Sequence, residues 1–140
     1  MRIVVFVLLS LLAVPAAFAD TFESKDAAVS MTGRVMEKVA AGDLRGGFGI
    51  VAPYAIVPPA EFEAMIGQAE LQMPIMTARF GNSIGYELIK NESVGDSLAQ
   101  VVYLHRFDKH ATVWRFILYR GHDGWVLNTF YFVDDIRAAL

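Results

Sequence analysis

The sequence predicts an α+β domain in which N-terminal helices pack on a curved antiparallel sheet of about four strands. Two observations lead to this prediction. Before about Gly81, apolar residues recur at spacings of three and four, which is typical of amphipathic helices. From Asn82 onward, runs rich in β-branched and aromatic residues alternate with short polar turns. Because short turns join strands that pair in antiparallel fashion, the second half of the chain should form a meander.

Residues 1–19 have the order of a secretory signal peptide. The basic residue Arg2 is followed by an apolar run from Ile3 to Leu12 and by the cleavage pattern Ala17-Phe18-Ala19. We predict cleavage after Ala19, a periplasmic or secreted protein, and a single mature domain over residues 20–140. The apolar run is shorter than the about 20 residues that a permanent anchor needs. We therefore expect no membrane association after cleavage.

The composition argues against two classes of function. The chain has 15 acidic and 12 basic residues and a formal net charge of −3, whereas nucleic-acid affinity depends on Lys and Arg that neutralise phosphates. It also has no cysteine, which removes disulfides and thiolate zinc sites. With 55% hydrophobic residues, the domain should be stable through its packed core alone.

Three helical segments are expected before the sheet. Ser24 is a suitable N-cap for the first, and Gly42 lies where a glycine commonly ends a helix. The second segment is short and is weakened by its glycines. Pro59 suits the first turn of the third, and Pro74 inside it predicts a kink or a break. The segments are 20–41, 43–54 and 60–79.

Four strands are expected after Asn82, over residues 84–90, 98–107, 112–120 and 125–133. The polar stretch 91–96 is expected to be a loop. Gly121 to Gly124 would form a four-residue turn that places Arg120 opposite Trp125. The last two hairpins make the meander antiparallel.

Strict alternation from that pairing assigns the side chains of the last hairpin to two faces. The first face would hold Trp114, Phe116, Leu118, Leu127, Thr129 and Tyr131. The second would hold Val113, Ile117, Tyr119, Val126, Phe130 and Phe132. Both faces are then apolar, and the helices can cover only one. We predict a homodimer through the other face. The alternative is that aromatic packing and the C-terminal tail cover it.

Several short stretches carry a family resemblance. They are Ala41-Gly42-Asp43-Leu44, Phe80-Gly81, Trp114-Arg115-Phe116 and the run from Asp123 to Asn128. With them, the mature chain resembles small exported bacterial proteins of unknown function with a cystatin-like or nuclear-transport-factor-like (SnoaL-like) cone. The resemblance implies a cavity between the helices and the concave sheet. Isomerases, dehydratases, ligand-binding proteins and assembly domains all share this fold, so the resemblance alone does not choose a function.

Five residues are candidates for the wall of such a cavity. Tyr103, His105, Arg115 and Asn128 would fix the orientation of a ligand, and Trp114 would contribute to an aromatic wall. The three histidines have no metal-ligand spacing, so we expect no metal and no cofactor. Enzymes of the resembled superfamily use a base with a tyrosine donor, but no acidic residue falls inside the strands after Glu87. If His105 has no active-site role, we expect it to be a hydrogen-bonded or interface histidine.

These observations lead to a main functional hypothesis and two alternatives. The main one is an exported, non-enzymatic domain that binds a small apolar or anionic ligand, or a protein partner, as a homodimer. Arg106 and Arg115 would anchor an anion; a cross-strand or intersubunit ion pair, for example with Glu87, is the competing role for them. The first alternative is a cofactor-free isomerase or lyase with His105 as base. The second is a purely structural role in which the sheet serves dimerisation. We expect no nucleic-acid partner.

Overall fold

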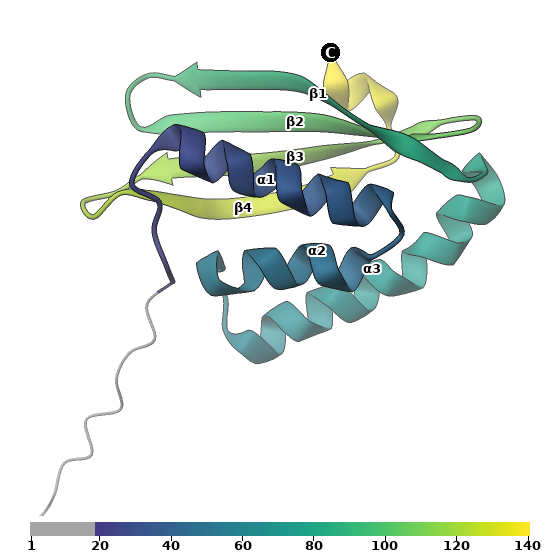
Figure 1. Cartoon of the computed structure of the whole chain (residues 1–140), viewed down its shortest axis with the longest axis horizontal. Coiled ribbons are helices and arrows are strands. Elements are labelled where there is room, and N and C mark those ends of the chain that lie inside the picture. Colours follow the sequence, from purple (N-terminus) through teal and green to yellow (C-terminus); the bar gives the residue numbers. More distant parts are fainter. Residues whose placement is uncertain (1–18) are drawn as a thin grey trace, which may run out of the picture.

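Three α-helices precede a four-stranded antiparallel sheet in the computed structural model, which describes residues 19–140 (Figure 1). All but the last residue of the expected signal peptide lie outside the described residues. The α+β prediction is confirmed. The elements are α1 (Lys25–Ala40), α2 (Leu44–Val51), η1 (Ala52–Tyr54), α3 (Pro59–Phe80), β1 (Ser83–Val94), β2 (Leu98–Phe107), β3 (Ala111–Arg120), β4 (Trp125–Val133) and η2 (Ile136–Ala139).

The first two helices begin at capping side chains, and α1 ends just before a glycine. The Ser24 hydroxyl accepts a hydrogen bond from the Ala27 N–H at 3.1 Å and caps α1. Gly42 follows α1 with φ of 87°, a conformation that suits glycine. The Asp43 carboxylate then accepts from the Gly46 N–H at 2.8 Å and caps α2. The short turn between the two helices holds them next to each other.

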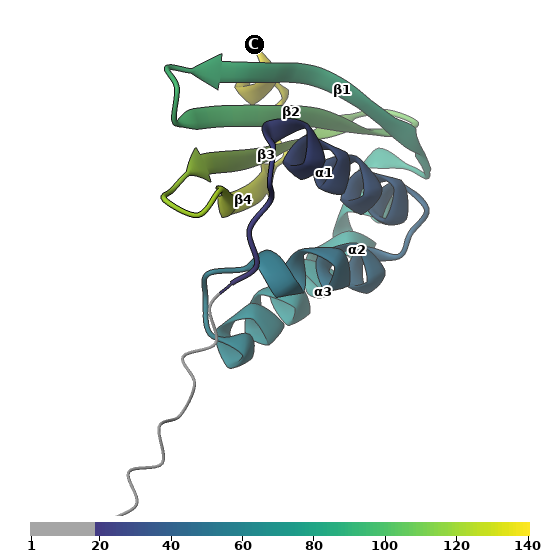
Figure 2. The same cartoon turned by 60° about the vertical axis from the view of Figure 1, so that its left-hand side comes forward.

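The third helix is longer and runs through its internal proline. It begins at Pro59, where a missing N–H costs nothing, and it continues past Pro74 to Phe80. Of the kink or break that Pro74 predicted, the break does not occur. Figures 1 and 2 show α1 running along the sheet, with α2 and α3 side by side below it. Among residues 19–140, none of the helices has the length and apolar character needed to cross a bilayer.

The strands follow the order β1-β2-β3-β4, and the sheet is open. The first strand is longer than expected, since residues 91–94 continue β1 instead of forming a loop. Glu92 pairs with Gln100, whose Nε2 donates to the Glu92 carboxylate at 2.7 Å. Polar side chains do not oppose pairing here because β1 is an edge strand in contact with water. The polar character of residues 91–94 therefore did not mark the end of β1.

A β-bulge in β4 changes the predicted faces of the last hairpin. Arg120 pairs with Trp125 as predicted, but the register then skips one residue, so that Leu118 pairs with Leu127 and Ile117 with Thr129. Asn128 is the extra residue. Because successive side chains alternate across a sheet, one extra residue reverses the faces of all the residues that follow it.

The predicted face assignment is therefore wrong for four residues. Phe130 and Phe132 pair with Phe116 and Trp114 and face the helices, whereas Thr129 and Tyr131 lie on the opposite, outer face. This change removes two phenylalanines from the face through which we predicted a homodimer. The outer face is accordingly less apolar than strict alternation indicated.

The inner face and the helices form an aromatic core at the β3–β4 side of the sheet. The Phe48 ring of α2 lies 5.1 Å from the Phe130 ring and 6.1 Å from that of Trp114. Phe62 of α3 lies 6.3 Å from Phe48, and Phe132 stacks on Trp114 at 4.6 Å. We call these five residues the aromatic core. Each fully buried aromatic side chain contributes about 1.5–3 kcal/mol.

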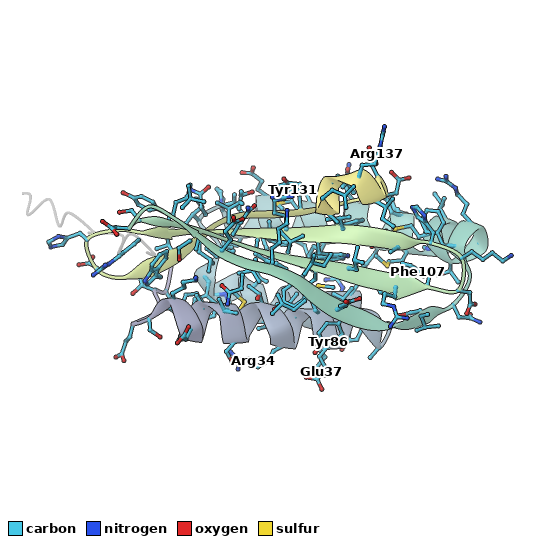
Figure 3. The ribbon with its side chains drawn as sticks, turned by 90° about the horizontal axis from the view of Figure 1, so that it is seen from above. Arg34, Glu37, Tyr86, Phe107, Tyr131 and Arg137 are labelled. Carbon is cyan, nitrogen blue, oxygen red and sulfur yellow. The ribbon has the colours of Figure 1, made fainter. Side chains whose placement is uncertain are left out.

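The C-terminal segment covers part of the outer face. Figure 3 shows η2, which carries Arg137, on the side of the sheet opposite α1. Ala139 is buried against Val102 and Val113, and the remaining tyrosines Tyr119 and Tyr131 are 47% and 46% exposed. The C-terminal tail thus covers part of the outer face, as expected if this face is covered within one chain and not by a second copy. The homodimer stays a prediction.

Candidate ligand cavity

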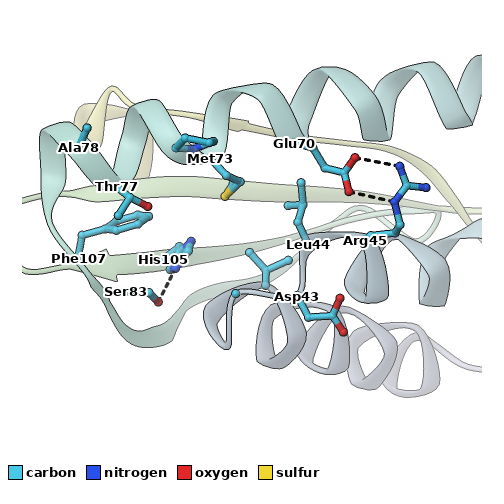
Figure 4. Close-up of a pocket in the computed structure, with 13 residues that line it drawn as sticks. Asp43, Leu44, Arg45, Glu70, Met73, Thr77, Ala78, Ser83, His105 and Phe107 are labelled. Atoms are coloured by element: carbon cyan, nitrogen blue, oxygen red, sulfur yellow. Dashed lines mark hydrogen bonds and ion pairs between the residues drawn. The ribbon is translucent and has the colours of Figure 1, made fainter.

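A cavity of about 710 Å³ lies between α3, the turn from α1 to α2, and the neighbouring ends of β1 and β2 (Figure 4). Its sheet side is formed by Ser83, His105 and Phe107, and its rim by Asp43, Arg45 and Glu70. Pockets that bind small molecules have volumes of about 300–1,000 Å³. The space is therefore large enough for a drug-sized compound.

Helix α3 forms one wall of the cavity. Met73, Thr77 and Ala78 line it, together with Pro74. Proline has no N–H, so the carbonyl of Glu70, four residues earlier, lacks the hydrogen bond that a regular helix would give it. The wall is thus mostly apolar and carries one hydroxyl.

His105 is the polar group on the sheet side. It lies on β2 between Tyr86 of β1 and Thr112 of β3, and it is only 2% exposed. Its Nε2 lies 2.8 Å from the hydroxyl oxygen of Ser83, and that hydroxyl donates to the Ala40 carbonyl at 2.7 Å. A serine hydroxyl has one proton. Because this proton bonds to Ala40, the Ser83 oxygen accepts from His105, and Nε2 carries the ring proton.

This arrangement leaves Nδ1 of His105 as an unprotonated acceptor. No group among the described residues donates a hydrogen bond to it. Burial lowers the pKa of His105 to about 4, because removal from water disfavours the charged ring. At neutral pH the side chain is therefore a neutral imidazole with a fixed tautomer and one unused lone pair.

An ion-pair cluster joins the two helices at the rim. The Arg45 guanidinium of α2 bonds Glu70 of α3 through two nitrogens, each at 2.9 Å, and Glu63 at 2.6 Å. These bonds lower the pKa of the Glu70 carboxyl and raise that of Arg45. The positive charge of Arg45 is thus already matched by two carboxylates. The nearby Asp43 carboxylate adds further negative charge to the rim.

Two of the candidates lie in the core and not in the cavity. The Tyr103 hydroxyl lies 2.9 Å from Thr32 Oγ1 beneath α1, and burial raises the pKa of Tyr103. Trp114 is completely buried, and its Nε1 donates to Thr112 Oγ1 at 3.2 Å. Both side chains support the sheet from its helix-facing side.

The other two candidates also lie outside the cavity. Arg115 is on the outer face, where its guanidinium bonds Gln100 and donates to the Ala138 carbonyl at 2.7 Å. Its contact with η2 fixes the C-terminal segment. Asn128 is exposed in the bulge of β4. Of the five candidates, the structure brings only His105 to the cavity.

The sequence did not identify the other polar residues that line the cavity together with His105. Ser83 begins β1 directly after the Gly81–Asn82 turn, and Arg45 and Glu70 come from different helices. No local pattern brings them together. The glycine turn before Ser83 was the only available signal, because it marks where the chain leaves α3 and enters the sheet.

These features define a class of protein. It is an α+β protein with helices on one face of an open antiparallel sheet and a ligand-sized cavity between them, which is compatible with the cone description. Within residues 19–140, no group of three or more acidic or histidine side chains is placed to hold a metal ion. No protein-family model, curated protein or solved structure matches the chain.

Proposed function

We propose that this protein is an exported, non-enzymatic binding protein of the SnoaL-like type whose small-molecule ligand occupies the cavity beneath α3. One observation carries the proposal. A cavity of about 710 Å³ with apolar walls ends at a buried histidine that has an unused acceptor. The signal-peptide pattern of residues 1–19 supports export.

The walls provide the driving force for binding. Val39, Leu44, Met73 and Phe107 line the cavity with hydrocarbon, sulfur and aromatic surface. Covering apolar area yields about 25 cal/mol per Å², and the polar groups then select the orientation. A ligand with an apolar body fits such a site.

The alternative of a cofactor-free isomerase or lyase rests on the lone pair of His105. That lone pair accepts a proton in principle, but a base is most effective when its pKa lies near the working pH. The pKa of His105 is lowered to about 4, and Tyr103, the expected proton donor, is bonded to Thr32 outside the cavity. Both facts favour binding over proton transfer.

Native mass spectrometry of the protein purified from its own periplasm tests the proposal. We expect a retained small molecule that dissociates at higher collision energy. In a Thr77→Trp variant the indole occupies the cavity, because Thr77 lines it (Figure 4), and the adduct should disappear. Ile75→Trp is the matched control, since Ile75 lies on α3, is 58% exposed and does not line the cavity. An adduct that survives in Thr77→Trp would contradict the proposed location.

The same spectra test the predicted homodimer. Tyr119 and Tyr131 remain exposed on the outer face, and a dimer through this face would cover them. We expect a dimer mass that Tyr131→Glu converts to monomer. A monomer mass for the unmodified protein at micromolar concentration would contradict the dimer and leave the ligand proposal intact.

A further inference from the structure

We propose that the outward side of α3 binds a second copy of this chain, with the two α3 helices packed antiparallel. The residues of this surface do not line the cavity, so the inference goes beyond the proposed function and does not depend on a ligand. The surface is also separate from the outer face of the sheet. Contact through α3 is therefore a second interface, and it stands whether or not the homodimer through the outer face forms.

The first observation is an apolar strip on the outward side of the helix. Five residues recur at spacings of three and four and therefore lie along one side of α3. They are Ala60, Ala64, Gly67, Leu71 and Ile75, which we call the α3 strip, and none of them is buried. Figures 1 and 2 show no other element of residues 19–140 beyond α3 on the side away from the sheet. Because the outward side of a surface helix is normally polar, the strip indicates a contact surface.

The two largest side chains of the strip are unusually exposed. Leu71 is 74% and Ile75 is 58% exposed, the highest values for large apolar residues in the helices and strands of residues 19–140. The opposite side of α3 already packs in the core through Phe62 and Ile66. Covering apolar area is favourable by about 25 cal/mol per Å². A partner outside this chain therefore gains free energy by covering Leu71 and Ile75.

Charge selects a second copy as that partner, in antiparallel orientation. Glu61 and Arg79 are 18 residues apart, which is about five helical turns, so they flank the strip on the same side at its two ends. Antiparallel packing about a twofold axis brings Arg79 of each copy to Glu61 of the other, whereas parallel packing places like charges together. Among the described residues, Glu61 has no ion pair, and Arg79 has one, to Asp134 at 3.6 Å. The strip therefore carries its own complementary charges.

The same pairing makes the two surfaces complementary in shape. Its midpoint is position 70, halfway between Glu61 and Arg79, so the Leu71 side chains of the two copies meet beside the twofold axis. Ile75 then lies opposite Ala64 and Gly67 of the second copy. Small residues opposite a large one let two helices approach to the usual distance of about 8–10 Å between their axes.

The size of the strip predicts a weak contact. The helix has 22 residues, so one side of it is about 33 Å long and about 10 Å wide, or about 300 Å² per copy. Stable interfaces cover about 800 Å² per partner. We therefore expect a dissociation constant on the order of 100 µM, so that association is seen only in concentrated samples.

Sedimentation velocity from about 10 to about 500 µM protein tests the contact. The sample is Tyr131→Glu, because this substitution removes the predicted dimer through the outer face. We expect monomer to convert to dimer around 100 µM, as the size of the strip indicates, and no conversion when Leu71→Glu is added. A monomer at every concentration would overturn the inference and leave the strip to a different protein partner.

Leu88→Glu in the same background is the matched control for Leu71→Glu. It makes the same exchange at a side chain that is 48% exposed on β1, and it should leave the association unchanged. Equal loss of association in the two variants would show that any added negative charge disrupts it, and the assignment to α3 would be wrong.

Cysteine cross-linking tests the antiparallel orientation, because the chain has no cysteine of its own. Glu61→Cys and Arg79→Cys are oxidised separately and as an equal mixture. We expect disulfide dimers only in the mixture, since antiparallel packing keeps position 61 of one copy about 27 Å from position 61 of the other. The mixed pair also retains one Glu61–Arg79 contact. Dimers in each separate variant would indicate parallel helices and overturn the inference.

A charge exchange tests the contact between the copies without a cross-link. Arg79→Glu should weaken the association about fivefold, because two attractive pairs become repulsive. Adding Glu61→Arg should restore it to within about twofold. The exchange does not restore the ion pair of Arg79 with Asp134, so only pairing between copies accounts for such a recovery. Absence of recovery would overturn the inference.

Discussion

The two ends of the space between helices and sheet differ in how they are filled. At the β3–β4 end, Phe48 and Phe62 reach from the helices to meet Trp114, Phe130 and Phe132. At the β1–β2 end, the helices contribute Leu44, Met73 and Thr77, and the cavity remains in front of His105. One sheet supports both ends. The helices therefore decide which end carries stability and which end is free to bind.

The largest expected effect on stability comes from a substitution at the β3–β4 end, which aromatic side chains fill. Phe48→Ala removes a ring that is 2% exposed and contacts three other aromatic rings. We expect a loss of about 3–5 kcal/mol in the free energy of unfolding, measured by urea denaturation followed by circular dichroism. Met73→Ala, at the half-buried cavity wall, is the comparison and should cost clearly less. Equal losses for the two variants would show that the ends do not differ in energy.

The second prediction concerns the pH dependence of stability at the open end. The pKa of His105 is lowered from 6.5 to about 4 by burial, so the unfolded chain binds a proton in this range and the folded protein does not. Stability should therefore fall as the pH drops from 6.5 to about 4, by up to about 3 kcal/mol. The measurement is the urea midpoint at a series of pH values.

His105→Gln is the control for this pH dependence. Carboxyl groups such as those of Glu70 and Asp135, whose pKa values are lowered by Arg45 and Arg137, also lose stabilisation in acid. They remain in the variant, so the difference between the two proteins isolates His105. Parallel curves between pH 6.5 and 4 would contradict a buried neutral histidine.

A smaller effect on stability is expected when the buried hydrogen bond between Tyr103 and Thr32, located between the two ends, is removed. The Tyr103 hydroxyl and Thr32 Oγ1 share a buried hydrogen bond of 2.9 Å, and Thr32 keeps its bond to Val29 at 2.7 Å when the tyrosine hydroxyl is removed. Tyr103→Phe should therefore cost about 0.5–1.5 kcal/mol in urea unfolding. A loss as large as that of Phe48→Ala would place Tyr103 within the energetic core of the filled end.

The smallest effect is expected at the rim. Arg45 and its partners Glu63 and Glu70 are exposed, and exposed ion pairs contribute little to stability. Arg45→Gln should leave the urea midpoint unchanged within error. A clear shift of the midpoint would mean that the rim cluster holds α2 against α3, and the open end would then contribute to stability after all.

Much of the fold was predictable because it depends on local chemistry. Ser24 and Gly42 mark the ends of α1, the run from Trp125 to Val133 is β4, and the Arg120–Trp125 pairing follows from the turn between them. Helix capping and short turns involve residues close in sequence. Their physical causes are therefore visible in the sequence.

The bulge in β4, the end of β1 and the cavity could not be predicted, because no local sequence pattern indicates them. Asn128 is polar like any turn residue, and nothing nearby signals that it is an extra residue in β4. The end of β1 was misjudged because edge strands, like loops, carry polar and charged side chains. The cavity unites His105 with Ser83, which lies 22 residues away, and with two helices. The sequence identified one of its polar residues but not its neighbours.

The bulge has a consequence for how the gene tolerates changes in length. Leu127 faces the helices, Thr129 faces outward and Phe130 faces the helices again, so the alternation is regular once Asn128 is left out. In-frame loss of the Asn128 codon would keep every later side chain on its present side. Loss of the codon for Thr129 together with retention of the bulge would turn Phe130 and Phe132 toward water. Length variation among descendants of this gene should therefore accumulate at codons 128 and 129, where a loss can remove the bulge, and be purged at the core positions that follow them.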